Sequence, residues 1–308
     1  MTPESQPVGQ HDGLAIQMDA PIATWLGVGG RAERLARPRS VDEVRACLAM
    51  DRDLLILGDG ANLLVCDEGV ERLVVDLQEL AHVKIDAGTG RVVAGAGARL
   101  LKLITDTVRA GLAGLEGLGG IPASIGGAIF MNAGGAFGEI GSAVRRARVM
   151  DRDGSLHDLL REQIAFGYRH SGLEDRIIIE AEFALTPSDP VALRTRLKEV
   201  MAYKKSSQPL GEDSAGCIFK NPTLPVPVAG IGDSGQRISA GLLIDRAGCK
   251  GLRVGSAMVS HGHANFIVVD KGGTADDVMQ VMSQVQRRVL ERFGVRLDPE
   301  VVVWEREP

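Results

Sequence analysis

Glycine is concentrated in a few short stretches of this sequence, and one of them constrains the fold more than any other feature. Residues 119–135 read Gly-Gly-Ile-Pro-Ala-Ser-Ile-Gly-Gly-Ala-Ile-Phe-Met-Asn-Ala-Gly-Gly, with little side-chain bulk. Glycine lets the backbone approach a ligand or another backbone closely. The stretch is therefore expected either to line a large flat ligand or to pack two small-residue elements tightly together.

The overall composition is that of a folded protein with a sizeable core. Of its 308 residues, 44% are hydrophobic and 24% are charged, which excludes a disordered chain. The 35 Lys and Arg against 40 Asp and Glu give a net charge of −5. A general nucleic-acid binder is not expected, because phosphate binding relies on clustered basic side chains.

The patterns of cysteine, histidine and hydropathy bear on metal binding and on the cellular location of the protein. None of the four cysteines is in C-x-x-C spacing, and His261 and His263 have no third ligand nearby, so no metal is expected. No secretory signal and no membrane-spanning run is visible, so the pattern favours a soluble cytoplasmic protein. The first dozen residues are expected to be a disordered tail.

Local patterns predict a mixture of helices and strands. Helices are expected from Ser40, with Glu43 in a capping box, over residues 100–108, after Asp189-Pro190, and from Thr274 to Gly294 with Asp277 in a capping box. Strands are expected at residues 54–57, 73–77, 91–94, 144–150 and 176–185. A domain boundary is expected near residue 210, where turn-forming residues begin to dominate.

A second glycine-containing loop follows the first of these strands. Its residues Gly58, Asp59, Gly60, Ala61, Asn62 and Leu63 could turn successive backbone N–H groups toward a pyrophosphate. Leu63 stands where the usual dinucleotide fingerprint has its third glycine, and a purely structural turn explains the loop equally well. Residues 230–235 match G-x-G-x-x-G and contain Gly-Asp-Ser-Gly, but the preceding segment is interrupted by prolines. We interpret them as a surface loop.

Three further positions carry side chains suited to chemistry. Tyr168-Arg169 on its own is usually a solvated pair or a cation–π contact. Cys217 could be an acid, a nucleophile or a small buried hydrophobic residue. Glu300 enters an apolar strand, where most such acids are simply solvated.

Taken in order, these segments resemble one family, UDP-N-acetylenolpyruvoylglucosamine reductase, from about Thr24 to Glu300. The resemblance rests on the two glycine-containing regions above and on the following further motifs: Thr24-Trp25 and Gly29-Gly30, Tyr168-Arg169-His170-Ser171, Gln208-Pro209, Ser214-Ala215-Gly216-Cys217-Ile218-Phe219-Lys220-Asn221-Pro222, Ala240-Gly241-Leu242-Leu243-Ile244-Asp245, Gly248-Cys249-Lys250-Gly251, Val259-Ser260, His263-Ala264-Asn265-Phe266 and Pro299-Glu300. Each motif is weak alone, but their number and order are specific.

The resemblance implies an α+β fold with vanillyl-alcohol-oxidase/PCMH-like FAD-binding domains and a C-terminal α+β substrate-binding domain. The implied divisions are residues 1–78 and 79–209 for the two FAD-binding subdomains and 210–308 for the substrate domain. The spacing resembles the shorter second type of the family. The implied FAD-binding residues are Gly58, Asp59, Gly60, Ala61, Asn62, Leu63, Gly120, Ile121, Pro122, Gly126, Gly127, Asn132, Ala133 and Gly134.

The implied activity is reduction of UDP-N-acetylglucosamine enolpyruvate to UDP-N-acetylmuramate with NADPH, in peptidoglycan precursor synthesis. Arg169 would stabilise the enolate-like state, Cys217 would deliver the proton, and Glu300 would orient the substrate or assist as an acid. The implied substrate-binding candidates are Tyr168, Lys204, Lys205, Asn221 and Lys250. No protein partner and no metal are implied.

The sequence departs from the family pattern at three places. Gly27 replaces the usual arginine, residues 223–237 look like an insertion, and Cys217 stands where serine is more frequent. Two other functions are open: another FAD-dependent oxidoreductase of the same fold, acting on a small alcohol or sugar, and a non-catalytic nucleotide-binding module. The first explains the glycine loops but not the presence of Cys217, Lys220 and Asn221 together with Glu300.

Overall fold

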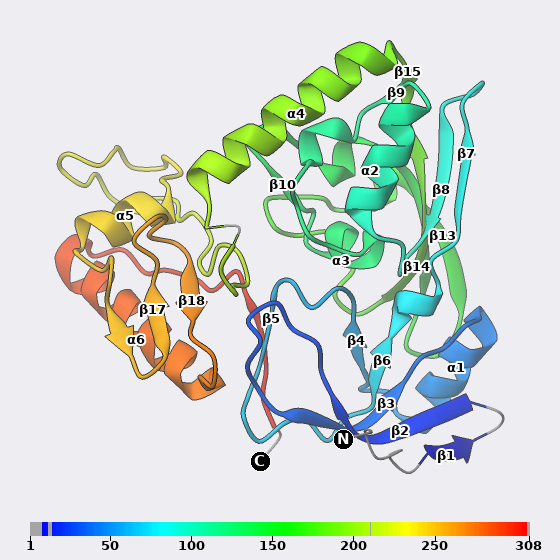
Figure 1. The fold of residues 1–308 in the computed structure, drawn as a ribbon, viewed down its shortest axis with the longest axis horizontal. Coiled ribbons are helices and arrows are strands. Elements are labelled where there is room, and N and C mark those ends of the chain that lie inside the picture. Colours follow the sequence, from blue (N-terminus) through cyan, green and yellow to red (C-terminus); the bar gives the residue numbers. More distant parts are fainter. Residues whose placement is uncertain (1–7, 12–13, 210, 307–308) are drawn as a thin grey trace. The chain divides into compact units, whose positions relative to one another are not determined.

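The computed structural model describes residues 8–11, 14–209 and 211–306, which form two compact units. The units interleave along the sequence (Figure 1). The first contains residues 1–20, 32–59 and 71–204, and the second contains residues 21–31, 60–70 and 205–308. The three-part division at residues 78 and 209 stays a prediction.

The first unit contains a five-stranded sheet in the order β1-β2-β3-β6-β4. Its strands are β1 (Val8–His11), β2 (Leu14–Pro21), β3 (Arg31–Ala36), β6 (Val74–Asp76) and β4 (Leu55–Leu57), with α1 (Val41–Met50) following β3. The pairs β3–β6 and β6–β4 are parallel, whereas β1 and β2 are antiparallel. The expected disordered tail is therefore wrong for Val8–His11, because these residues pair with β2. The rest of that tail lies outside the described residues.

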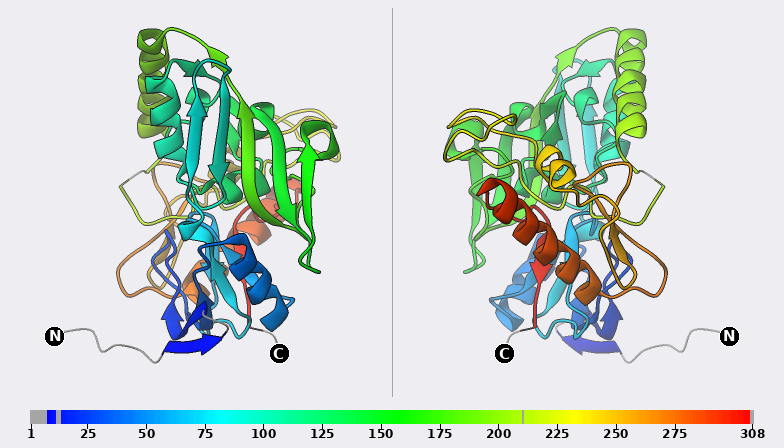
Figure 2. Two further views of the ribbon diagram at one scale, coloured as in Figure 1. Left: turned by 90° about the vertical axis from the view of Figure 1, so that its right-hand side faces the viewer. Right: turned by 90° about the vertical axis from the view of Figure 1, so that its left-hand side faces the viewer.

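The second sheet of this unit is antiparallel, in the order β13-β12-β14-β8-β7. Its strands are β7 (Val83–Asp86), β8 (Arg91–Gly95), β12 (Val144–Met150), β13 (Leu156–Leu160) and β14 (Ile177–Ala184). Helices α2 (Leu100–Arg109), α3 (Ile125–Phe130) and α4 (Pro190–Ser207) lie on one side of the sheet (Figures 1 and 2). Inward residues such as Val92, Ile104 and Phe183 form the core between them.

Short elements complete the first unit. The pairs are β9 (Leu112–Ala113) with β15 (Thr186–Pro187), and β10 (Gly134–Gly135) with β11 (Gly138–Glu139). Single 3-10 turns are formed at Leu77–Glu79, Glu116–Leu118, Ile140–Ser142 and Arg161–Gln163.

The second unit has its own core, built on a three-stranded antiparallel sheet of β16 (Arg253–Val254), β17 (Ala257–Val259) and β18 (Ile267–Val269). Helices α5 (Ala240–Arg246) and α6 (Ala275–Phe293) contribute buried side chains to this core. Strands β5 (Leu63–Val65) and β19 (Val302–Trp304) pair in parallel, which joins two distant parts of the sequence. Among the described residues, no helix is long and apolar enough to cross a bilayer.

Local sequence signals predicted the long helices correctly. Ser40 Oγ accepts from the N–H of Glu43 at 3.2 Å at the start of α1, and Asp189 caps α4. The second half of the expected Ser40–Glu43 capping box is shifted by one residue, because the Glu43 carboxylate accepts from the Arg39 N–H at 2.7 Å. Thr274 caps α6, which ends at Gly294 with φ of +67°. The expected capping box with Asp277 is wrong in its second half, because the Asp277 carboxylate accepts from the Ser256 N–H instead. The Asp67 carboxylate accepts from the N–H groups of Ala275 and Asp276, which adds a tertiary cap.

Two short helices were missed by the periodicity argument. Helix α3 lies inside the glycine-rich stretch, and α5 follows the insertion. Each begins at a serine cap: Ser124 Oγ accepts from Gly127 N–H, and Ser239 Oγ from Leu242 N–H. Both helices have seven residues or fewer, too short for a 3.6-residue period to be recognised.

The structure gives a conformational reason for one departure from the family pattern, Gly27, and shows how the insertion is folded. Gly27 has φ of +66°, a left-handed conformation that an arginine would adopt only with strain. In the insertion, an antiparallel bridge joins Thr223 to Arg237 and a second joins Val228 to Gly232. Residues 233–237 are exposed, as a surface loop should be.

Candidate active site

Tyr168 and Arg169 form the tip of a tight turn in the first unit. Gly167 and His170 exchange two backbone hydrogen bonds, of 2.9 and 3.3 Å, around this pair. Arg169 has φ of +55°, one of only three positive values among the described non-glycine residues. Its guanidinium carbon lies 5.2 Å from the centre of the Tyr168 ring. A bulky residue in this conformation costs about 1–3 kcal/mol and is typical of functional sites.

The Tyr168–Arg169 turn is anchored to the residues that follow α3. Asn132 is fully buried, and its Nδ2 donates to the Gly167 carbonyl oxygen at 2.8 Å while its Oδ1 accepts from Gly141 N–H at 3.0 Å. Ser171 Oγ donates to the Phe130 carbonyl oxygen at 2.9 Å. The glycine-rich stretch and the Tyr168–Arg169 motif, distant in sequence, are thus fastened together by buried side chains.

Lys204, near the end of α4, is the second cation of this region. Its side chain is only 8% exposed. Burial and then the positive charge of Arg169 lower the pKa of Lys204 to about 8. A Cβ atom at Gly120 would lie 3.0 Å from Lys204 Cδ, so this glycine lets the lysine stem pack against the stretch. Two cations in one region suit an anionic group such as a carboxylate or phosphate. The neighbouring Lys205 is exposed.

Cys217 lies in a tightly held segment of the second unit. Its side chain is partly buried, whereas Cys47, Cys66 and Cys249 are buried. Directly after it, the Ile218 N–H donates to the Asn265 carbonyl oxygen at 2.9 Å. The Asn265 side chain then bonds Phe219 twice, accepting from its N–H at 3.0 Å and donating to its carbonyl oxygen at 2.8 Å.

Glu300 belongs to the same cluster as Cys217. The Glu300 N–H donates to the Ile218 carbonyl oxygen at 2.7 Å, and its carbonyl oxygen accepts from Asn62 Nδ2 at 3.0 Å. Cys217 directly precedes Ile218, and Glu300 is hydrogen-bonded to the Ile218 backbone. The structure therefore brings these two predicted catalytic residues to the same short segment. The amide of Asn62, predicted to bind cofactor, is used to hold Glu300.

The remaining substrate-binding candidates lie around α5. Asn221 Oδ1 accepts from the Ala240 N–H at 2.9 Å, so it helps to begin that helix. Lys250 pairs with Asp245 at 3.1 Å. His263 Nδ1 accepts from Asn265 N–H at 3.2 Å, and burial lowers the pKa of the imidazole. This favours a neutral ring with its proton on Nε2.

With the site described, comparison with known proteins decides the family. Residues 208–304 match the C-terminal domain of UDP-N-acetylenolpyruvoylglucosamine reductase, and residues 32–160 match an FAD binding domain. The UDP-N-acetylenolpyruvoylglucosamine reductase of Moorella thermoacetica is 40% identical over 302 residues, covering 95% of both chains. The chain belongs to the UDP-N-acetylenolpyruvoylglucosamine reductase family.

Further members agree with this assignment. The Pediococcus pentosaceus reductase is 39% identical and covers 89% of this chain and 88% of its own. The crystal structure of the enzyme from Thermus caldophilus superposes with a TM-score of 0.76 at 39% identity, covering 91% of this chain and 95% of that one. The fold is α+β, with an FAD-binding part and the C-terminal domain of this reductase family, as the sequence predicted.

The glycine-rich stretch fits FAD, the cofactor of this fold, although several of its glycines also serve packing. A Cβ at Gly126 would lie 3.0 Å from Ala96 Cβ, and one at Gly119 would lie 2.5 Å from Leu197 Cδ1. Gly120, Ile121 and Pro122 are nevertheless partly exposed, so backbone is accessible there with little side-chain bulk. Both of the expectations for the stretch, close packing and an accessible backbone surface, have support in the geometry.

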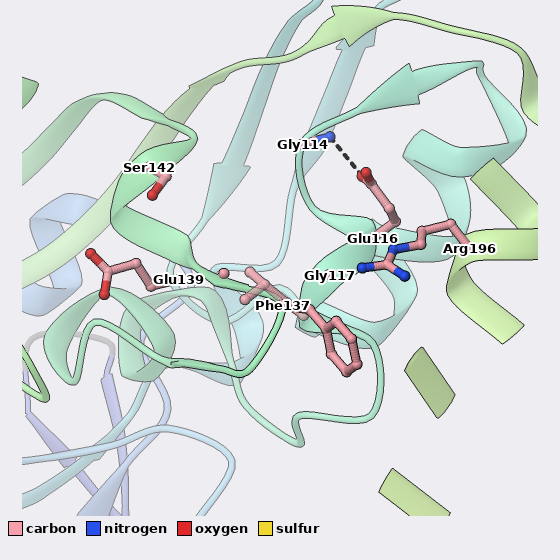
Figure 3. Close-up of a pocket in the computed structure, with 9 residues that line it drawn as sticks. Gly114, Glu116, Gly117, Phe137, Glu139, Ser142 and Arg196 are labelled. Atoms are coloured by element: carbon pink, nitrogen blue, oxygen red, sulfur yellow. Dashed lines mark hydrogen bonds between the residues drawn. The ribbon is translucent and has the colours of Figure 1, made fainter. Parts of the chain in front are cut away.

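A cavity of about 320 Å³ in the first unit contains none of the predicted site residues (Figure 3). Phe137, Glu116, Glu139 and Arg196 are among its lining side chains. The Gly114 N–H donates to Glu116 Oε2 at 2.7 Å, and Arg196 lies over the Phe137 ring at 4.8 Å and pairs with Glu199. Arg169, Cys217 and Glu300 are not among its lining residues, so we do not assign the proposed chemistry to this cavity.

The sequence analysis gave Asn132 only an FAD-binding role and Asn265 no individual role, but both side chains hold the backbone of the site. Asn132 and Asn265 are both buried, and each uses its side-chain amide to bond the backbone beside a predicted catalytic residue. The available signal was an asparagine within an otherwise small or apolar run. Such a residue needs buried hydrogen-bond partners, but the sequence does not say which.

Proposed function

We propose that this protein reduces UDP-N-acetylglucosamine enolpyruvate to UDP-N-acetylmuramate with NADPH, using FAD. The single observation that carries this proposal is identity of 40% over 95% of the chain to a reductase of that name. The comparisons give no support to a small-alcohol or sugar oxidoreductase. Synthesis of a peptidoglycan precursor places the protein in the cytoplasm, and no protein partner is needed for the reaction.

When bound, FAD would supply the hydride-transfer chemistry between NADPH and the methylene carbon of the enol ether. The residues of the chain must bind the substrate and manage the negative charge and the proton. Negative charge develops on the adjacent carbon and its carboxylate. Arg169 is the proposed partner of that carboxylate, because a planar guanidinium can give it two parallel hydrogen bonds. Lys204 adds a second positive charge to the same region of the first unit.

Cys217 Sγ is the proposed proton donor. The hydride and this proton together convert the carbon–carbon double bond into a lactyl ether, and the thiolate recovers a proton from solvent. A thiol has an ordinary pKa of about 8.5, so it is mostly protonated at neutral pH and is a stronger acid than a serine hydroxyl. The accessible position of Cys217, against three buried cysteines, supports this choice.

Glu300 is proposed to orient the substrate or assist as an acid beside Cys217. Its position supports this role, because Cys217 directly precedes Ile218 and the Glu300 N–H donates to the Ile218 carbonyl oxygen. Tyr168, Lys205, Asn221 and Lys250 are proposed to contact the substrate, although Asn221 and Lys250 also have structural partners in α5. Backbone of the Gly58–Leu63 loop and of the glycine-rich stretch is proposed to hold FAD.

The proposal is tested anaerobically with purified protein. The protein should carry FAD and be yellow, and NADPH should remove its flavin absorbance. Adding UDP-N-acetylglucosamine enolpyruvate should then restore the absorbance and yield UDP-N-acetylmuramate in equal amount. Loss of absorbance with NADPH but no recovery with this substrate would contradict the assigned substrate. Protein that takes up no FAD would contradict the whole proposal.

A further inference from the structure

The backbone directly after Cys217 is held mainly by one distant residue, Asn265. Three of its polar atoms bond this segment: the carbonyl oxygen bonds the Ile218 N–H, and Oδ1 and Nδ2 bond the Phe219 N–H and carbonyl oxygen. Residues near the end of the chain bond the remaining backbone groups of this segment. The Glu300 N–H donates to the Ile218 carbonyl oxygen, and the Lys220 N–H donates to the Asp298 carbonyl oxygen.

The chemistry of an amide explains why asparagine is suited to this position. Its side chain offers one acceptor and one donor in a single plane, which matches the N–H and carbonyl of one residue. Phe219 is thereby bonded as if by a neighbouring strand. Asn265 is only 3% exposed, so water cannot replace either bond without an opening of the structure.

Asn265 is itself fixed. Its N–H donates to His263 Nδ1 at 3.2 Å, and the next residue, Phe266, packs its ring edge-on to His263 with ring centres 4.7 Å apart. The Phe266 carbonyl oxygen also accepts a hydrogen bond from the Ser260 N–H. The backbone of Asn265 is therefore held in place, and its side-chain amide, bonded twice to Phe219, links the Cys217 segment to it.

We propose that Asn265 is a positioning residue that sets the place of the Cys217 thiol. The inference rests on the proposed function, in which Cys217 Sγ donates the proton. Asn265 does not touch the reacting atoms in this account; it acts through Phe219 and Ile218. A displacement of about 1 Å in a catalytic group can cost 10²-fold in rate, so loss of the amide should be felt in the proton-transfer step.

The test uses the FAD-loaded protein with the variant Asn265→Asp. This substitution keeps the acceptor for the Phe219 N–H but removes the donor to its carbonyl oxygen. Loss of flavin absorbance with NADPH should stay close to the native rate, whereas its recovery with the enolpyruvyl substrate should slow by about 10²-fold. Asn265→Ser, which can make one bond to Phe219, serves if the aspartate variant does not fold.

A double variant separates positioning from general damage. In the Cys217→Ala background, Asn265→Asp should slow recovery little further, because the group that it positions is gone. The control Val285→Ala removes packing from α6 in the same core, at a residue 1% exposed, and should lower thermal stability without changing the ratio of the two rates.

A readout without turnover completes the test. Iodoacetamide should alkylate Cys217 faster in Asn265→Asp than in native protein or Val285→Ala, because the segment is less firmly held. Equal slowing of both half-reactions, full additivity with Cys217→Ala, or unchanged alkylation would overturn the inference. Normal recovery in Cys217→Ala alone would instead contradict the proton-donor role in the proposed function.

Discussion

Arg169 and Lys204 are cations of one region, but their side chains differ in what they can do. Arg169 keeps its charge at any working pH, and its planar fork can bond a carboxylate twice. Lys204 is buried and has a pKa lowered to about 8, so its charge changes as the pH passes through about 8. The two residues therefore lead to different predictions.

Substitution Arg169→Lys should be poorly tolerated although the charge is kept. An ammonium cannot present two parallel donors, and loss of a transition-state donor costs about 10²–10³ in turnover. The rate of absorbance recovery with the enolpyruvyl substrate measures the effect. Near-native recovery would remove Arg169 from the mechanism.

For Lys204, we expect the KM for the anionic substrate to rise as pH increases through about 8. Burial and Arg169 favour the neutral amine, so the attraction for an anion is complete below this pKa and is lost above it. Lys204→Arg should keep KM level to higher pH, because guanidinium does not lose its proton there. An exposed lysine of the same helix, α4, offers a matched control: Lys198→Met should keep the native pH dependence.

The thiol of Cys217 should matter only after hydride transfer from NADPH. Cys217→Ala should retain FAD and lose its absorbance normally with NADPH. Its recovery with substrate should slow by about 10²–10⁴, the usual contribution of a positioned general acid. Cys217→Ser should recover much faster than Cys217→Ala, since a hydroxyl keeps a proton in nearly the same place. The opposite order would identify Cys217 as merely a small buried residue.

At the scale of elements, the short helix α3 and the Tyr168–Arg169 turn behave as one assembly. Two hydrogen bonds join the turn to the end of α3. Asn132 Nδ2 donates to the carbonyl oxygen before Tyr168, and Ser171 Oγ donates to the last carbonyl oxygen of α3. These buried hydrogen bonds stabilise the turn and so offset the energetic cost of the positive φ of Arg169. A buried asparagine has a similar role in the second unit, where the Asn265 amide bonds the backbone two residues after Cys217.

Replacing Asn132 with aspartate should weaken this assembly strongly. The carboxylate cannot donate to the Gly167 carbonyl oxygen, and leaving a buried polar group unsatisfied costs about 1–3 kcal/mol. Urea unfolding should show this loss. Ser171→Ala, which removes one neutral hydrogen bond, should cost about 1 kcal/mol and serves as the comparison. Native stability in Asn132→Asp would show that the bond contributes little.

At the scale of the whole molecule, each compact unit carries part of the proposed machinery. The first holds Arg169, Lys204 and the glycine-rich stretch, and the second holds Cys217, Glu300 and Asn62. The chain passes between units several times, with residues 21–31 and 60–70 belonging to the second.

Adding FAD to cofactor-free protein should raise its melting temperature with ligand concentration. A ligand that binds only the folded state adds about 2.7 kcal/mol at 100 times its dissociation constant. FMN, which lacks the adenosine and one phosphate, should stabilise less at equal concentration. Differential scanning fluorimetry measures both, and a melting temperature indifferent to FAD would contradict the cofactor assignment.

The sequence alone determined what depends on neighbouring residues. Ser40, Asp189, Thr274 and Gly294 act within one helical turn, so the long helices were predicted with their caps. The ordered motifs also determined the family, and with it the α+β fold and FAD. Helix α3 could be found only through its cap at Ser124, because six residues are too few to show a period.

Tertiary structure decided everything that joins distant residues. The parallel pairing of β5 with β19, the bonds of Asn132 to Gly167 and the bonds of Asn265 to Phe219 each connect segments far apart in sequence. Likewise, the lowered pKa of Lys204 arises from burial and from Arg169, which the local sequence does not contain. A side-chain amide satisfies whichever buried backbone groups the packing brings to it, so its partners are fixed only when the chain is folded.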